Sequence, residues 1–148
     1  MKFSQKTACV FLSLMGMFLA IPSAHAAERL TITCIAASNN GHDFDIDNDA
    51  YRDQIMRLFA YKSYDQLGLA AVNLEPGVAS EMKIPGDYDL YLKLISVENH
   101  QDKVHVLIKK GGMEYVDTIL TLTKPGVVFL GGPKMDEGDL IIVLEMGF

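Results

Sequence analysis

The sequence predicts an α+β fold that is mainly antiparallel β, a sheet or sandwich of about seven to eight strands with one helix after the first strand. Three observations lead to this fold class. Apolar and polar residues alternate with period two in several segments, among them 90–94 and 104–109, as they do in half-buried strands. Short turns rich in Gly, Pro and Asn separate these segments. Only residues 51–59 have the apolar spacing of an amphipathic helix.

The first 26 residues have the pattern of a secretory signal peptide. Lys2 and Lys6 provide a positive start, residues 9–22 form an apolar run, and residues 24–26 (Ala-His-Ala) match a cleavage site. We therefore expect signal peptide 1–26 to be removed and a single β-rich domain, 27–148, to be periplasmic or secreted. The apolar run is shorter than a membrane span of about 20 residues, and no later segment is longer and as apolar.

The charge of the chain argues against two classes of partner. It has 13 basic and 19 acidic residues, and loss of Lys2 and Lys6 with the signal would leave 11 basic residues against those 19. Nucleic acids and anionic lipid surfaces both require a basic face, so neither is an expected partner. Cys34 would be the only cysteine of the mature chain, which excludes an internal disulfide. We expect it to be a small buried residue of a strand.

The first strand and the helix are predicted from composition and spacing. Residues 30–36 are rich in Ile and Thr and are typical of a strand. Tyr51, Ile55, Leu58 and Phe59 stand at i, i+4, i+7 and i+8 and would form one apolar stripe on a helix. Aspartates precede this segment, where the helix dipole favours negative charge.

The next segments are predicted strands with one irregular position. Residues 61–67 and 69–74 form either one long strand or two short strands about Gly68. A short strand at 79–84 lies between two Pro-Gly turns. In the strand that follows, the apolar phase shifts at Ile95, which predicts a β-bulge.

The last third of the chain predicts a hairpin and two further strands. The Gly-Gly pair at 111–112 lies between an alternating strand at 104–109 and a return strand with one apolar face. Residues 127–130 form a short strand that Gly-Gly-Pro at 131–133 should end. Residues 140–144 are continuously apolar, so we expect this strand to be buried on both faces.

Several short motifs occur in a fixed order along the chain: IAASN at 35–39, LFAYKSY at 58–64, IPG at 84–86, DTILTL at 117–122, GGP at 131–133 and LII at 140–142. The ordered set resembles a group of small secreted or periplasmic bacterial β-rich proteins of unknown function. The resemblance covers nearly the whole mature chain and implies an exported bacterial protein, without implying a reaction, a cofactor or a catalytic residue.

The acidic loop at residues 42–49 is the candidate metal site. Asp43, Asp45 and Asp47 match positions 1, 3 and 5 of a calcium-binding loop. The match ends there, because position 6 is Asn48 and position 12 is Gln54, where such loops have Gly and Glu. A solvated loop that caps the helix and a weak calcium- or ligand-binding module both remain open.

Catalytic signatures are missing from the sequence. It has no G-x-S-x-G or H-E-x-x-H motif, and its Gly-rich segments lie between strands and do not open a helix. We assign no catalytic residue, and an enzyme of unrecognised type stays as a third alternative.

Tyrosines recur at predicted strand positions and suit either core packing or a face that binds a partner or a glycan. Tyr61, Tyr64 and Tyr91 are the candidate partner-binding residues. The leading hypothesis is a non-enzymatic periplasmic or secreted domain that binds a protein partner at the bacterial cell envelope. An exposed sheet edge would accept a strand of that partner.

Overall fold

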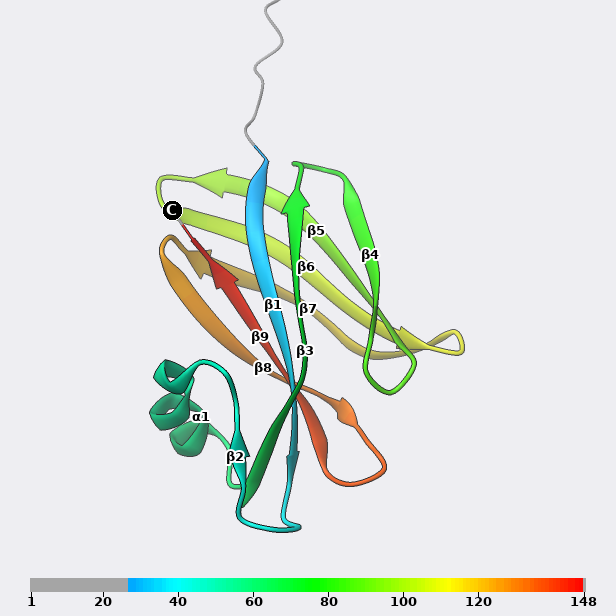
Figure 1. Cartoon of the computed structure of the whole chain (residues 1–148). Helices are drawn as coiled ribbons and strands as arrows, with labels where there is room; N and C mark the ends of the chain where they lie inside the picture. Colours follow the sequence, from blue (N-terminus) through cyan, green and yellow to red (C-terminus); the bar gives the residue numbers. More distant parts are fainter. Residues whose placement is uncertain (1–26, 148) are drawn as a thin grey trace, which may run out of the picture.

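The protein forms two β-sheets that pack face to face, with one short helical segment outside them (Figure 1). This computed structural model describes residues 27–147, so the predicted signal peptide lies outside the described range. The elements are β1 (Glu28–Ser38), β2 (Phe44–Asp45), the 3-10 helix η1 (Asp49–Tyr51), α1 (Arg52–Leu58), β3 (Ser63–Leu74), β4 (Ala79–Ile84), β5 (Tyr88–Glu98), β6 (Gln101–Lys110), β7 (Met113–Thr123), β8 (Gly126–Lys134) and β9 (Asp139–Met146).

The strand order confirms the predicted fold class. Sheet A has the order β2-β3-β1-β9-β8 and sheet B has the order β4-β5-β6-β7. All pairings between the longer strands are antiparallel, whereas the two-residue β2 pairs in parallel with β3. Sequence analysis did not anticipate β2, because two residues carry no periodic signal. Within residues 27–147 neither helical segment is long and apolar enough to cross a bilayer.

The main core lies between the two sheets. Inward-facing side chains of β1, β5, β6 and β9 fill it; buried residues alternate along β5 and β6, whereas the middle of β1 and most of β9 are continuously buried. The five residues of β9 from Leu140 to Leu144 are all 0% exposed, which confirms the expected burial on both faces. Such a core stabilises the sandwich mainly by removing apolar surface from water.

A second core on the outer face of sheet A explains why β9 is buried twice. Tyr51 and Ile55 of the helical segment pack there against Val143 and Phe129, and Asn48 caps η1 by accepting a hydrogen bond from Ala50 N at 3.0 Å. Figure 1 shows this segment covering one end of the sheet only.

The predicted helical stripe is half correct. Tyr51 and Ile55 are buried, but Leu58 is 61% exposed, and Phe59 has left the helix because its backbone is extended. Spacing alone predicted that all four side chains would share one buried face, whereas α1 ends at Leu58.

Local irregularities follow the sequence in most places. The register of β5 shifts between Leu94 and Ser96, which confirms the bulge at Ile95. The predicted stop after residue 130 is wrong, because β8 continues through Gly-Gly-Pro to Lys134. Glycine is required at position 132, where a Cβ atom would lie 2.8 Å from the carbonyl oxygen of Leu140.

One end of the sandwich is held by a partly buried ionic cluster. Lys124 Nζ lies 2.5 Å from Glu28 and 2.9 Å from Asp102, whose side chain is 0% exposed. Burial acts to lower the pKa of Lys124, but the two carboxylates outweigh it, so the pKa is raised. This cluster joins the start of β1 and of β6 to the turn between β7 and β8.

Candidate strand-binding site

The most unusual feature of the surface is the unpaired side of β3. β1 pairs with β3 along its whole length, whereas β2 accompanies it only at Tyr64 and Asp65. Within residues 27–147 no strand pairs with the other side of residues 66–74, which we call the free edge (Figure 1). An unpaired edge presents backbone N–H and C=O groups that another strand can bind.

The composition of the free edge sets it apart from the other edges. Its sequence, QLGLAAVNL, has no charged residue and no proline. By contrast, edge strand β4 has Glu81 and Lys83, β7 has Glu114 among its charged residues, and β8 has Pro133. Charged side chains and proline on an edge discourage further strand pairing. The free edge of β3 is therefore the edge on which pairing is least opposed.

An open groove runs beside the free edge, between β3 and β4, and we call it the edge groove. It consists of two cavities of about 200 and 230 Å³ that share Met82 as a wall. Core residues Ile32 and Cys34 line the first cavity and Leu92 lines the second. On the β3 side the inward residues are small. A Cβ atom at Gly68 would have no neighbouring heavy atom within 4 Å, so there is open space in front of this residue. The small residues of β3 thus leave unfilled space beside the main core.

Specific contacts close both ends of the edge groove. At the β2 end, Gln66 Nε2 donates to Asp47 Oδ2 at 2.8 Å, and Asp47 N donates to Gln66 Oε1 at 3.2 Å. At the other end the chain crosses to sheet B, where Gly77 N donates to the carbonyl oxygen of Leu94 at 2.9 Å. The segment between these ends is roughly 30 Å long at about 3.3 Å per residue.

The β2 end of the groove is negatively charged. Asp45 and Asp65 are register partners in the parallel β2–β3 pair, and both are exposed. Like charges directly opposite each other destabilise a strand pair. Within residues 27–147 neither carboxylate forms an ion pair, whereas Lys83 across the groove is paired with Asp89 at 2.5 Å.

The thiol at the bottom of the first cavity is not a reactive group. Cys34 is 5% exposed, which confirms the expected burial, and that burial raises its pKa from 9.0 to about 11. At neutral pH the thiol is therefore protonated, and protonated thiols are poor nucleophiles.

The structure does not assemble the candidate calcium site. Asp43, Asp45 and Asp47 are exposed, and within residues 27–147 no three Asp, Glu, His or Cys side chains come together in a geometry that could hold a metal ion. The reason is local: Asp45 lies in the extended strand β2, and Asp47 is engaged by Gln66. An extended backbone cannot wrap alternate carboxylates around one cation as a calcium loop does.

A cavity beside the acidic loop has the opposite charge. It measures about 340 Å³, and Arg52 lies over the ring of Phe44 with 4.7 Å between guanidinium carbon and ring centroid. Its lining contains three basic side chains and no acidic one: His42, Phe44, Arg52, Met56, Tyr61, Lys62 and Tyr64. We call this the basic cavity. It suits an anion better than a calcium ion.

The three candidate tyrosines do not form one surface. Tyr64 is 2% exposed and its hydroxyl donates to the carbonyl oxygen of Phe59 at 2.8 Å, so it is a core residue with no surface for a partner. Tyr61 is half-buried beside it, bonds to Asp139 through its hydroxyl, and lines an aromatic cleft of about 440 Å³. Tyr91 lies on β5 between the buried Leu90 and Leu92, and so on the outer face of sheet B.

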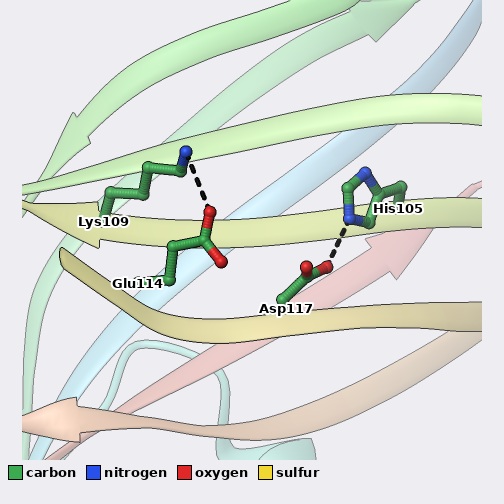
Figure 2. Close-up of polar contacts among 4 residues, drawn as sticks. All are labelled: His105, Lys109, Glu114 and Asp117. Atoms are coloured by element: carbon green, nitrogen blue, oxygen red, sulfur yellow. Dashed lines mark hydrogen bonds and ion pairs between the residues drawn. The ribbon is translucent and has the colours of Figure 1, made fainter. Parts of the chain in front are cut away.

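A histidine–aspartate pair on the outer face of sheet B is the arrangement closest to a catalytic one. His105 Nε2 lies 2.6 Å from Asp117 Oδ1, and Lys109 and Glu114 form a second pair at 3.1 Å. Figure 2 shows the two pairs side by side on neighbouring strands. Within residues 27–147 His105 forms no other side-chain hydrogen bond, so no serine or cysteine completes a nucleophile–base pair. The pairs instead connect β6 with β7 across the strands.

Sequence reasoning missed the free edge as a specific site, although it anticipated binding at some sheet edge. The available signal was the uncharged run at 66–74, in which Gly68 and Ala70 alternate with larger residues. That signal becomes meaningful only when the strand order places β3 beside the opening between the sheets.

Comparisons of the chain with protein-family models, with curated proteins and with solved structures find no match.

Proposed function

We propose that this protein is a non-enzymatic domain that binds an extended segment of another protein by adding it as a strand to β3. The observation that carries the proposal is the uncharged free edge beside an open groove into the core. In strand addition, main-chain hydrogen bonds provide affinity and pockets for alternate side chains provide specificity. The free edge and the edge groove offer both.

The cellular setting is part of the same proposal. Residues 1–26 have the pattern of a signal peptide, and we infer that the domain acts in the periplasm or outside the cell, at the bacterial envelope. A long, uncharged edge promotes aggregation unless something covers it. A partner strand would satisfy the edge and fill the edge groove.

The test measures the binding of nine-residue peptides to the purified protein. Each peptide that binds is then made in two N-methylated forms. One form has methyl groups on alternate amides that would face β3, and the other has them on the amides that would face solvent. We expect one form to lose binding and the other to keep it, because N-methylation removes a donor from only one side of a strand. Equal binding of the two forms would show that the main chain is not the recognised element.

The basic cavity supports a second candidate function, a ligand-binding module beside the acidic loop. His42, Arg52 and Lys62 line it together, and within residues 27–147 none of them forms an ion pair. The candidate ligand is a small anion. Calorimetric titration with inorganic phosphate, citrate and, separately, calcium checks it: heat with an anion that Arg52→Gln abolishes and Lys103→Gln retains would support it. Heat with calcium alone, or with nothing, would end it.

A further inference from the structure

We infer that the strand accepted by β3 has two bulky apolar side chains two residues apart, followed two residues further on by a basic side chain. This inference rests on the proposed strand addition and specifies the partner's chemistry. Three features of the edge groove support it: the two cavities, their spacing, and the charge at the β2 end.

The two cavities each suit one side chain of an incoming strand. The first is lined mainly by apolar groups, among them Ile32, Met82 and Ile84. The second adds Leu92 and Val72, with Ser80 and Glu81 from β4. The first cavity is not filled from β3 itself, because Gly68 and Ala70 are the inward residues beside it. Apolar side chains entering from outside would therefore complete the core.

The spacing of the cavities matches a β-strand. Among the inward residues of β3, Gly68 and Ala70 line the first cavity and Val72 lines the second, so the two cavities adjoin at Ala70 and Val72, which are two residues apart. Side chains on one face of a strand recur every second residue, about 6.6 Å apart. Positions i and i+2 of the incoming strand therefore reach the two cavities.

The pairing register places two carboxylates on the inward face of sheet A, beyond the first cavity. Cys34 pairs with Gly68 and Ala36 pairs with Asp65, and a bulge at Leu67 accommodates the extra residue of β3. Since Cys34 and Ala36 lie on the same face of β1, Asp65 lies on the face of Gly68, and its partner Asp45 shares that face. Since β2 occupies the edge at Asp65, the last inward side chain of an incoming strand lies opposite Gly68, two residues beyond the one opposite Ala70, and can extend toward the two carboxylates. A Lys or Arg there would relieve their repulsion.

A second copy of this chain does not fit the groove. If two β3 strands paired with each other, the inward side chains offered would be Gly68, Ala70 and Val72, which leave most of both cavities empty. Each copy would also bring its own Asp65 to a groove that is already acidic. The occupant is a different protein with larger apolar side chains and a cation.

The experiment uses a nine-residue peptide with isoleucine at two alternate positions, arginine two residues further on and threonine elsewhere, made in both chain directions. Three matched peptides replace both isoleucines by alanine, replace arginine by glutamate, or move one isoleucine out of phase. Fluorescence anisotropy gives the affinity, and hydrogen–deuterium exchange reports protection of residues 66–74. The protein variants are Asp65→Asn and, as a control, Asp117→Asn on the outer face of sheet B.

We expect the alanine and out-of-phase peptides to bind at least about tenfold more weakly than the parent peptide. The preference for arginine over glutamate should decrease with salt and largely disappear in Asp65→Asn, but persist in Asp117→Asn. If all peptides protect residues 66–74 with equal affinity, strand addition stands and the inferred motif is wrong. If the arginine preference survives Asp65→Asn, the charge assignment is wrong. If no peptide protects these amides, the proposed function itself fails.

Discussion

Filling the edge groove from within the chain should raise stability and abolish partner binding together. Gly68→Val is the direct perturbation, because the Cβ of residue 68 meets no heavy atom within 4 Å and its backbone is outside the left-handed region. Replacing glycine inside a strand gains about 0.5–1 kcal/mol. Partial burial of the valine methyl groups in the first cavity, which holds about 200 Å³, adds roughly 1 kcal/mol. We expect a total gain of about 1–2 kcal/mol.

Chemical denaturation measures this gain, and fluorescence anisotropy with the isoleucine–arginine peptide measures binding. We expect the denaturation midpoint to rise and the peptide affinity to fall at least about tenfold, because valine occupies the position of an incoming side chain. The matched control is Asn73→Val on the same strand, at an exposed position that lines neither cavity. If Gly68→Val destabilises the fold, or leaves binding unchanged, the groove is not the side-chain site.

Three further outcomes follow from the structure. Burial raises the pKa of Cys34 from 9.0 to about 11, so the free energy of unfolding should fall by about 2–3 kcal/mol as the pH rises from 9 to 11, where the unfolded chain loses the thiol proton first. Denaturation curves at pH 8 to 11 measure this fall, and Cys34→Ala should remove it. Lys124→Met should cost about 3–5 kcal/mol in urea unfolding because it leaves the buried Asp102 unpaired, and adding Asp102→Leu should restore most of this, so an equal loss in both variants would contradict the assignment. Leu69→Lys places a charge at a 66% exposed position of the free edge and should reduce self-association in light scattering without altering the denaturation midpoint; unchanged aggregation would show that another surface is responsible.

Elements with a strong local signal could be predicted from the sequence. The phase shift at Ile95 predicts a bulge whichever strand pairs with it, and the unbroken apolar run of β9 predicts burial on both faces. The sequence could not decide between one long strand and two short strands about Gly68, because glycine is compatible with a turn and with an irregular strand. Pairing with β1 decides for one strand, and the extra residue is accommodated at Leu67.

Features that depend on distant residues could not be predicted. Gly-Gly-Pro reads as a stop, but β9 comes so close to β8 that glycine at position 132 is required inside a strand. Tyr61, Tyr64 and Tyr91 look equivalent in sequence, yet they lie in a cleft, in the core and on the opposite sheet. The free edge likewise exists only because β4 joins the other sheet instead of pairing with β3.

Residue-resolved hydrogen–deuterium exchange of β3, with and without the isoleucine–arginine peptide, is the sharpest test of strand addition to the free edge. In the free protein, the amides of residues 66–74 that face away from β1 should exchange fast, because no described strand pairs with them. The peptide should slow these amides and leave the outer edges of β7 and β8 unchanged. Protection that falls on β7 or β8, or that is absent from β3, would contradict strand addition to the free edge.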